Sequence, residues 1–382
     1  MNVLIYLHSL QAGGAERATA TLSKHWVEKG WQLTVVTLSS ASGDFYQLHP
    51  AVQRVALNVA GESRSPLAAV GNNLRRIVAL RRVLRERRPD VALAMMDTAN
   101  ILLALATIGS RGLVTIGSER THPPQSPLPR PWNALRSRLY GHLTAVAALT
   151  RESAAWLREH TRAQHVAVIP NAATWPLVAQ QPTLTPPCLA GDRSYLLAVG
   201  RLVSSKGFDV LIAAFARLCA DLPSWQLVIL GEGPERKALE AQVAVAGLAE
   251  RVLLPGRAGN VGDWYAASSL YVMSSRFEGF PNTLAEAMAC GLPAVSFDCD
   301  TGPRDIIRHE VDGLLVPAGD AAALEAALRR LMADPSLRGR FAARASEVRE
   351  RFSLASVSAR WEQLFRQMQA ALQSSGNHRR KP

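Results

Sequence analysis

Short apolar segments alternate with longer segments of helical character along most of the chain, and this alternation constrains the fold more than any other feature. The short segments are continuous runs of apolar residues, which is typical of strands buried on both faces of a parallel sheet. Helices of ten or more residues between such strands build βαβ units. The sequence therefore predicts an α/β protein with doubly wound sheets. The predicted strands are residues 2–7, 32–38, 90–95, 113–118, 145–149, 165–170, 194–200, 225–231, 251–256, 270–275 and 293–297.

A proline-rich segment interrupts this alternation once. Residues 174–191 contain four prolines and no clear periodicity, so we interpret them as a linker. A chain of 382 residues is long enough for two domains. A ligand-binding cleft is expected between the two domains. The predicted parts are a first domain at 1–180, a second at 181–350, a helix at 351–371 that packs back toward the first domain, and a flexible tail at 372–382.

Basic residues are concentrated in the first half of the chain. Residues 1–180 contain 20 Lys and Arg against 10 Asp and Glu, a net charge of +10. Residues 181–382 contain 23 against 21, a net charge of +2. This asymmetry indicates that the first half meets an anionic partner. Nucleic acid is not expected, because aromatic residues make up only 6% of the chain and no known nucleic-acid-binding module is present.

Two arginine-rich segments suggest what that partner is. Residues 72–88 carry seven arginines and one glutamate. They form either a helix that covers the sheet with a cationic outer face or a contact with anionic lipid headgroups. Residues 130–140 add Trp132, Tyr140 and more arginine, a mixture favoured at membrane interfaces. We expect an anionic membrane surface as a partner. Four apolar residues of the first segment are predicted to share one helical face: Leu74, Ile77, Val78 and Leu84.

Other segments bear on the location of the protein and on metals. No apolar run approaches the roughly 20 residues needed to cross a bilayer, and no basic leader precedes the first apolar run. We therefore expect a cytoplasmic protein, peripheral on the inner face of the membrane. The four cysteines form no C-x-x-C pair, and the nine histidines form no H-E-x-x-H motif. The sequence predicts neither a metal site nor a cofactor.

A glycine pair and a basic loop follow predicted strands. Gly13 and Gly14 lie between the first strand and a helix, where backbone N–H groups can approach an anion; the alternative is a tight turn without a ligand. Arg201 and Lys206, in "GRLVSSKG", follow the first strand of the second domain. Two cations at a strand end suit a diphosphate, and the alternative is a solvated basic loop. The segment "GEGPE" (231–235) lacks the third glycine of a dinucleotide fingerprint and is interpreted as a turn with Pro234 at the helix start.

The segment "SSRFEGFPNTLAEAMACGLPAV" (274–295) places two carboxylates, Glu278 and Glu286, on either side of a loop awkward for regular structure. A sugar hydroxyl could bond Glu278, and a phosphate could meet the backbone N–H groups of "GFPNT". Glu286 could bind a ribose diol. The alternative is that Thr283 and Glu286 form a T-x-x-E capping box, in which the glutamate only satisfies backbone donors.

These segments together resemble glycosyltransferase family 4, whose members are retaining enzymes of the GT-B fold. Residues 276–291 resemble the E-x7-E signature, "GRLVSSKG" the G-R-L-x3-K-G segment, and "AGGAE" the glycine loop of the first domain. "GEGPE", "VIPNA" (168–172) and "VDGLLVP" (311–317) also lie at family-like places, so the resemblance covers nearly the whole chain. It implies two facing Rossmann-like domains with a cleft between them.

The resemblance also implies residue roles. Arg201 and Lys206 would hold the donor diphosphate, helped by the Gly13–Gly14 loop. Glu278 would contact the donor sugar and Glu286 the ribose. The loop beneath the sugar and phosphate would be Gly279, Phe280, Pro281, Asn282 and Thr283.

The segment "IGSERTHPPQSP" (116–127) resembles the S-E-R-N segment of bacterial glycan-assembly members, with Thr121 where Asn is usual. Glu119 and Arg120 are therefore candidates for the acceptor side. His122 is a candidate catalytic residue beside Glu278, Arg201 and Lys206, and the alternative is a surface loop. Asp97 is a weaker candidate.

The implied function is transfer of a hexose or N-acetylhexosamine from a nucleotide diphosphate sugar, with UDP as the expected nucleotide. The acceptor would be a lipid-linked or growing glycan in polysaccharide or lipopolysaccharide biosynthesis. Such enzymes retain the anomeric configuration and need no metal. Two alternatives stay open: a nucleotide-sugar epimerase of the same two-domain architecture, and a basic non-enzymatic protein that binds nucleic acid or membrane.

Overall fold

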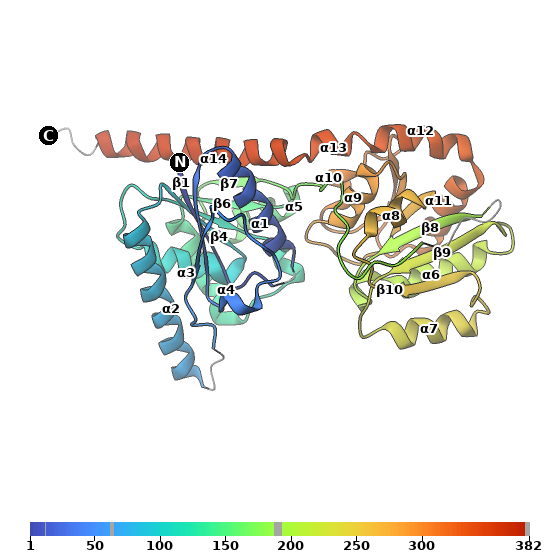
Figure 1. Cartoon of the computed structure of the whole chain (residues 1–382), viewed down its shortest axis with the longest axis horizontal. Coiled ribbons are helices and arrows are strands. Elements are labelled where there is room, and N and C mark those ends of the chain that lie inside the picture. The colour runs from blue at the N-terminus through green and yellow to red at the C-terminus, as the bar shows by residue number, and fades with distance from the viewer. Residues whose placement is uncertain (12, 62–64, 187–192, 379–382) are drawn as a thin grey trace. The chain divides into compact units, whose positions relative to one another are not determined.

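The chain folds into two compact units. The computed structural model describes residues 1–11, 13–61, 65–186 and 193–378. Unit 1 comprises Met1–Asn171 together with the C-terminal segment from Val357, and unit 2 comprises Ala172–Ser356 (Figure 1). The first boundary therefore lies at residue 171, earlier than the predicted boundary at 180.

Unit 1 is built on a parallel sheet that has seven strands within the described residues, in the order β3-β2-β1-β4-β5-β6-β7. The strand order reverses between β1 and β4, as in doubly wound folds. Residues on both faces of the central strands are fully buried, because helices cover both sides of the sheet. The elements are β1 (Asn2–Leu7), α1 (Gly14–Glu28), β2 (Gln32–Thr37), η1 (Ala41–Gly43), β3 (Gln53–Ala56), α2 (Pro66–Arg87), β4 (Val91–Met95), α3 (Asp97–Thr107), β5 (Val114–Ser118), η2 (Pro123–Gln125), α4 (Arg130–Leu139), η3 (Tyr140–His142), β6 (Ala145–Ala148), α5 (Arg151–His160) and β7 (Val166–Val168).

Unit 2 repeats this architecture with a parallel sheet of six strands among its described residues, in the order β10-β9-β8-β11-β12-β13. Here the strand order reverses between β8 and β11. The elements are β8 (Ser194–Val199), η4 (Ser204–Lys206), α6 (Phe208–Leu218), β9 (Trp225–Leu230), α7 (Arg236–Val245), β10 (Val252–Gly256), α8 (Val261–Ala266), β11 (Leu270–Met273), α9 (Asn282–Ala289), β12 (Ala294–Asp298), α10 (Pro303–Ile306), β13 (Gly313–Pro317), α11 (Ala321–Ala333), α12 (Pro335–Ala345) and α13 (Val348–Arg351).

Each strand predicted from an apolar run is confirmed. Two strands were not predicted. β13, "GLLVP", was named only as part of a family-like segment. β3 was missed because its sequence "QRVA" has no apolar run and its residues are exposed or only partly buried. It extends the sheet at one edge, beside β2. Each unit has its own apolar core between sheet and helices, and Tyr6, Leu102 and Val146 in unit 1 and Phe215, Leu227 and Phe297 in unit 2 are nearly or fully buried.

The proline-rich segment is not a free linker over its described part, 174–186. Its backbone bonds to the loop after β10, because the N–H of Gln180 donates to the carbonyl of Gly259 at 3.1 Å. The Asn260 side chain pairs with the backbone N–H and carbonyl of Leu184, each at 2.9 Å. The guanidinium of Arg349 lies 3.9 Å from the ring of Trp175. The segment is therefore part of unit 2, and the rest of it, 187–191, lies outside the described residues.

The last helix, α14 (Leu354–His378), continues beyond the predicted helix end at 371, so residues 372–378 are helical and not a flexible tail. From Val357 onward this helix belongs to unit 1. The indole N–H of Trp26 on α1 donates to the Ser358 hydroxyl at 2.8 Å, and the rings of Trp26 and Phe365 lie 5.5 Å apart. Lys29 and Glu362 form an ion pair at 2.6 Å. Residues 379–382 lie outside the described residues.

Candidate functional site

Two loops meet at the carboxyl edge of the unit 2 sheet, where the strand order reverses. β8 ends at Val199 and β11 ends at Met273, and the two strands are neighbours. Ligands of doubly wound sheets bind outside the carboxyl ends of the strands at this position. We refer to residues 200–207 as the β8 loop and to residues 274–281 as the β11 loop.

The β8 loop and the β11 loop contact each other through their backbones. The N–H of Arg276 donates to the carbonyl of Ser205 at 2.8 Å, and the Ser274 hydroxyl donates to the carbonyl of Lys206 at 2.9 Å. Gly207 has a φ of 63°, and a Cβ there would lie 2.1 Å from the Ser274 carbonyl oxygen. Only glycine fits this position, so Gly207 allows the two loops to approach.

Lys206 and Glu278 form an ion pair across the two loops. The ammonium nitrogen of Lys206 lies 2.6 Å from Oε1 of Glu278, and both side chains are partly buried, with exposed fractions of 22% and 12%. The Ser275 hydroxyl donates to the same carboxylate oxygen at 2.7 Å, and the Thr301 hydroxyl donates to the main-chain carbonyl of Glu278. An ammonium group has three N–H donors, so Lys206 can keep this partner and still bind an anion.

Arg201 differs from Lys206 because its side chain is exposed. Within the described residues its guanidinium has no hydrogen-bond or ion-pair partner. Its backbone is fixed by the neighbouring residues, since the N–H of Gly200 donates to the carbonyl of Leu230 and the N–H of Leu202 to that of Glu232, each at 2.9 Å. An arginine whose backbone is fixed by its neighbours and whose guanidinium has no partner is suited to bidentate binding of a phosphate.

The glycines of the "GEGPE" turn allow this turn to pack closely against the β8 loop. A Cβ at Gly231 would lie 1.8 Å from the carbonyl oxygen of Gly200, and a Cβ at Gly233 would lie 2.3 Å from that of Leu202. The turn therefore lies directly against the backbone of the β8 loop. The prediction that Pro234 begins a helix is wrong, because α7 starts two residues later, after a turn.

Glu286 is not part of a capping box. Helix α9 begins at Asn282 and has no side-chain hydrogen bond at its cap, while the Thr283 hydroxyl accepts a hydrogen bond from the phenol of Tyr271 at 2.9 Å. Glu286 is buried, with an exposed fraction of 6%. Burial, and secondly the Glu286 carboxylate, raise the pKa of Cys290 to about 11. The capping alternative is therefore wrong, and a buried carboxylate lies one turn inside the helix.

The loop between the two glutamates has an apolar inner side. Phe280 is 6% exposed, and its ring lies 5.7 Å from that of Phe352. Pro281 is also buried, and a Cβ at Gly302 would lie 2.4 Å from its ring. Gly279 and the first residues of α9 remain partly accessible. Phe280 and Pro281 thus anchor the loop. The N–H of Asn282 donates to the carbonyl of Phe280 at 2.9 Å, and the next N–H groups of α9 lie at a helix start, where N–H groups lack intrahelical partners.

The glycine pair of unit 1 is arranged differently from the prediction. Gly13 caps α1 with an extended φ of −168°, which any residue can adopt. A Cβ at Gly13 would lie 2.2 Å from a carboxylate oxygen of Glu16, so glycine makes room for that side chain. Glu16 lies in the first turn, where negative charge is favourable. A carboxylate already lies at this helix start, and this weakens the prediction that Gly13 and Gly14 bind a phosphate.

Glu119 lies inside unit 1. It is 1% exposed and accepts a hydrogen bond from the Tyr140 phenol, which in turn accepts one from the Asn100 side chain at 3.1 Å. Burial raises the pKa of Glu119 to about 7, although Arg136 lies 3.9 Å away and opposes this rise. The carboxyl group thus belongs to an internal network at the carboxyl end of β5, and not to an exposed acceptor surface.

Arg120 and His122 are also buried, each 8% exposed. Arg120 donates to the side-chain oxygen of Asn171, and burial lowers its pKa to about 10. His122 shares a hydrogen bond of 2.9 Å with the hydroxyl of Ser153, and the Thr150 hydroxyl donates to the same Ser153 oxygen and caps α5. The alternative of a solvated surface loop is wrong for these side chains. The catalytic role of His122 stays a prediction.

The structure revises two further expectations for unit 1. Asp97 opens α3 and accepts a hydrogen bond from the N–H of Thr98, so it serves the helix start. Tyr140 is fully buried, Trp132 packs against the unit 1 core, and Arg136 is 2% exposed with its guanidinium 4.7 Å from the Trp156 ring. Tyr140 and Arg136 are therefore not available to the membrane-interface mixture expected for residues 130–140, and Trp132 is only partly accessible.

Some residues of the site were not predicted. Ser275 and Thr301 hold Glu278, and Asp209 holds Arg276 at 2.7 Å. Ser275 lies three residues before Glu278, and that spacing was the one available signal. Thr301 is distant in sequence, and only the fold brings its hydroxyl to the β11 loop.

Two family descriptions match the two halves of the chain. "Glycosyltransferase Family 4" matches residues 12–173, and "Glycosyl transferases group 1" matches residues 187–348. The lipopolysaccharide core biosynthesis glycosyltransferase LpsD of Rhizobium meliloti is 31% identical over 75% of this chain and 78% of its own length. This chain belongs to glycosyltransferase family 4. Its activity class, glycosyl transfer, follows from that membership.

Other relatives differ in the share of their own length that this chain covers. An exopolysaccharide phosphotransferase of Streptomyces coelicolor is 33% identical over 76% of this chain but only 30% of its own length. A Campylobacter jejuni N-acetylgalactosaminyltransferase, named for a glycan substrate linked to undecaprenyl diphosphate, is 25% identical over 97% of this chain and all of its own length.

Solved structures share the fold. Sucrose-phosphate synthase from Thermosynechococcus elongatus superposes with a TM-score of 0.80 at 20% identity, over 97% of this chain and 100% of that one. Anabaena HepE in complex with UDP superposes with a TM-score of 0.79 at 19% identity, over 96% and 100%. The predicted GT-B class with two Rossmann-like units is confirmed.

The described residues show neither a cluster of metal ligands nor a membrane-spanning helix. Within them, no group of three or more His, Cys, Asp or Glu side chains is arranged to hold a metal ion. None of the helices in the described ranges combines the length and the apolar character that a membrane crossing requires.

Proposed function

We propose that this glycosyltransferase moves a hexose or an N-acetylhexosamine from a UDP-sugar, with retention of the anomeric configuration and without a metal ion. The observation that carries the proposal is the grouping at the carboxyl edge of unit 2, where exposed Arg201 lies on the same loop as the Lys206–Glu278 pair. Anabaena HepE, which shares the fold, was solved in complex with UDP, and this supports the choice of nucleotide.

The grouping matches what the reaction demands. When the bond between the sugar and the diphosphate breaks, negative charge grows on the leaving diphosphate oxygen. Arg201 would bind two phosphate oxygens, and Lys206 would donate to a third while one of its protons stays with Glu278. The first N–H groups of α9 would add to this stabilisation.

The two carboxylates would fix the rest of the donor. Glu278, held by Ser275 and Thr301, would bind a hydroxyl group of the sugar. Glu286 would bind the ribose hydroxyls. Carboxylate oxygens accept hydrogen bonds, which suits the hydroxyl donors of a nucleotide sugar.

For the acceptor, we propose a lipid-linked or growing glycan of polysaccharide or lipopolysaccharide biosynthesis, bound by unit 1. The names of the Rhizobium and Campylobacter relatives support this class. The net charge of +10 on residues 1–180 supports a peripheral location at the inner face of the membrane, where anionic lipids lie.

A donor panel tests the proposal. UDP- and GDP-sugars would be incubated with the protein, with and without undecaprenyl diphosphate-linked acceptors, in EDTA, while release of the nucleoside diphosphate is followed. Wild type would run beside Arg201→Ala, Lys206→Ala and Glu278→Ala, with Arg340→Ala on the exposed face of α12 as the matched control.

Turnover of one UDP-sugar that survives EDTA and the control change, and that the three site changes abolish, is the expected result. Product anomers read by NMR would test retention. Tight donor binding that survives all three changes would place the site elsewhere.

A further inference from the structure

Helix α2 has an apolar stripe that unit 1 does not cover. Leu67, Val70, Leu74 and Val78 are exposed by 86%, 68%, 60% and 60%. They recur every three or four residues and therefore share one face of the helix. The buried face is a different one, because Leu80 and Leu84 belong to the unit 1 core. The predicted grouping of Leu74, Ile77, Val78 and Leu84 on a single face is wrong, since Leu74 and Val78 face outward.

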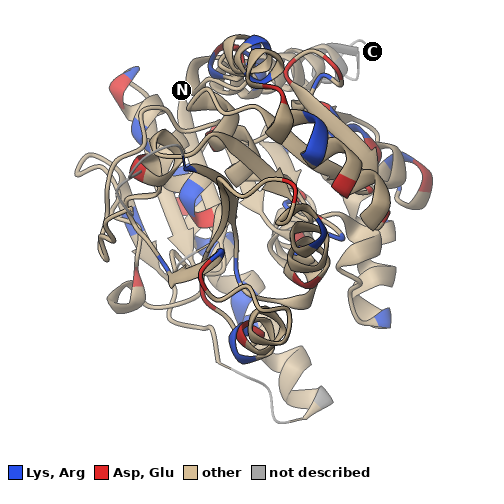
Figure 2. Ribbon diagram, turned by 90° about the vertical axis from the view of Figure 1, so that its right-hand side faces the viewer, with Lys and Arg blue, Asp and Glu red and all other residues tan. Residues whose placement is uncertain are grey.

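The same exposed face becomes cationic in the second half of α2. Arg81 and Arg85 continue the spacing from Val78, and Arg82 lies beside them. The first turns of α2, up to Leu74, contain no charged residue, and all of its charges follow. The start of this helix is drawn without blue or red in Figure 2. An apolar stripe that ends in arginines is the pattern of a surface that meets both the apolar and the anionic layers of a lipid interface.

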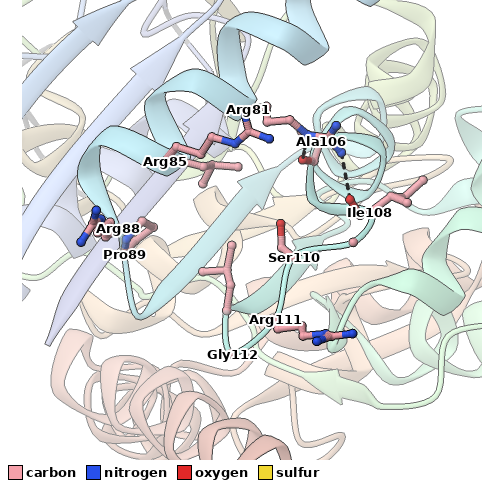
Figure 3. Close-up of a pocket in the computed structure, with 12 residues that line it drawn as sticks. Arg81, Arg85, Arg88, Pro89, Ala106, Ile108, Ser110, Arg111 and Gly112 are labelled. Atoms are coloured by element: carbon pink, nitrogen blue, oxygen red, sulfur yellow. Dashed lines mark hydrogen bonds between the residues drawn. The ribbon is translucent and has the colours of Figure 1, made fainter.

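A pocket of about 450 Å³ opens where this face ends (Figure 3). Four arginines line it, Arg81, Arg85, Arg88 and Arg111, and no acidic residue does. Among the described residues, none of Arg85, Arg88 and Arg111 has a carboxylate partner. Four arginines in the lining of one pocket supply positive charge that suits an anion.

The loop after α3 gives the pocket a fixed wall. The Arg81 guanidinium donates to the carbonyls of Ala106 at 2.8 Å and Ile108 at 2.9 Å, which ties α2 to this loop. Gly109 and Gly112 adopt positive φ values of 81° and 76°, so the loop turns sharply around Ser110. Ile108 also lines the pocket and is 49% exposed, which places an apolar side chain next to the arginines.

The pocket lies at the opposite edge of the sheet from the residues predicted to face the acceptor. Pro89 and Leu113 line it, and they precede the starts of β4 and β5. Glu119 and Arg120 follow the end of β5. The pocket is therefore a separate site from the predicted acceptor side of unit 1.

We propose that the α2 stripe and the arginine pocket bind an anionic phospholipid surface, with the stripe among the lipid chains near the headgroups and a lipid phosphate in the pocket. Charge complementarity selects this occupant, because an apolar ligand would not need four arginines and a free phosphate would not need the stripe. The inference deepens the membrane location proposed above. It does not depend on glycosyl transfer.

Vesicle flotation with the full chain tests the proposal. Neutral phosphatidylcholine vesicles are compared with vesicles that also contain phosphatidylglycerol. The pocket variant is Arg85→Gln/Arg111→Gln and the stripe variant is Leu74→Ser/Val78→Ser. The matched control, Arg340→Gln/Arg360→Gln, removes the same charge from exposed positions on α12 and α14.

Wild type and control should float with the anionic vesicles and not with the neutral ones. Loss of two arginines near the surface should weaken binding roughly 30-fold. The stripe variant should also bind more weakly, with an unchanged dependence on salt. All four proteins should turn over donor sugar equally in solution, so a failure here is distinguishable from a failure of the proposed transferase activity.

Three results would overturn the proposal. One is equal loss of binding in the pocket variant and the control, which would mean that only net charge matters. Another is stabilisation by inorganic phosphate without vesicle binding, which would assign the pocket to a free anion. The last is a wild-type dimer that the stripe variant converts to a monomer while vesicle binding is unaffected, which would assign the stripe to a second copy of the chain.

Discussion

The carboxyl edges of the two sheets carry charged residues in opposite situations. In unit 2, Arg201 is exposed and Lys206 and Glu278 are only partly buried. In unit 1, Glu119 and Arg120 are buried and bonded to their own unit. The strand topology is of the same kind in both units, so topology alone does not decide whether such residues meet a ligand.

The two units differ in the partners that hydrogen-bond to these charged side chains. A buried ionisable group must find partners inside the protein, since leaving it unpaired is costly. Accordingly, Glu119 accepts a hydrogen bond from Tyr140, and Arg120 donates one to Asn171. The β8 and β11 loops satisfy mainly their backbones with one another and leave cationic side chains at the surface. The side chains of unit 2 thus stay accessible at the surface, whereas the corresponding side chains of unit 1 hold the unit together.

The sharpest test removes a cation from unit 2. Arg201→Ala or Lys206→Ala should lower donor turnover by about 10²–10³-fold, because each removes a donor to the charge that develops on the diphosphate. The free energy of unfolding should change little for Arg201→Ala, since that side chain is exposed. Steady-state kinetics and urea unfolding measure the two quantities. If the changes lowered the free energy of unfolding but not donor turnover, these unit 2 side chains would have a structural role like those of unit 1.

The second test concerns the pH dependence of unit 1. Because burial raises the pKa of Glu119 from 4.5 to about 7, the folded protein keeps a proton that the unfolded chain releases. This stabilisation is present below about pH 4.5 and is lost as the pH rises to about 7. Glu119→Gln stays neutral throughout, so the fall in unfolding free energy over that range should shrink by on the order of 3 kcal/mol.

Urea unfolding across the pH series measures this effect, with the exposed Glu250→Gln as the control. If the pH slope is the same with and without Glu119, the carboxyl group is solvated and the contrast with unit 2 is weaker than described.

A third test separates the structural and catalytic roles of His122. If the ring serves mainly the Ser153–Thr150 cluster at the start of α5, His122→Ala should cost about 1–2 kcal/mol of unfolding free energy. Turnover per folded molecule should then stay close to wild type. A hundredfold drop in kcat with unchanged stability would instead support the predicted catalytic role.

The smallest expected effect is at Thr301. Its hydroxyl donates to the Glu278 carbonyl, and Thr301→Val removes that bond while keeping the shape. We expect a cost of about 1 kcal/mol, seen as a rise in KM for the donor more than as a fall in kcat. Thr19→Val, which removes a buried hydroxyl bonded to its own helix in unit 1, is the matched control.

Apolar continuity predicted most of both sheets because parallel strands are buried on both faces. It missed β3, an edge strand without such a run, and β13, whose short apolar run was not interpreted as a strand. Sequence spacing also located Glu278 and Glu286. It could not show that α9 begins at Asn282, which removed the capping box, or that Phe280 faces Phe352. The burial of Glu119 and His122 depends on residues that are distant in the sequence. The local sequence pattern therefore could not predict it.

Helix α14 has a practical consequence for dissecting the chain. Unit 2 is an insertion within unit 1, since unit 1 resumes at Val357. A fragment truncated after residue 171 or 180 would lack the partners of Trp26, including Phe365 and Ser358. Such a fragment would expose two indoles, Trp26 and Trp31, that otherwise pack with that phenylalanine. A stand-alone first unit therefore has to be made by splicing the final helix back on, or by supplying it as a separate peptide.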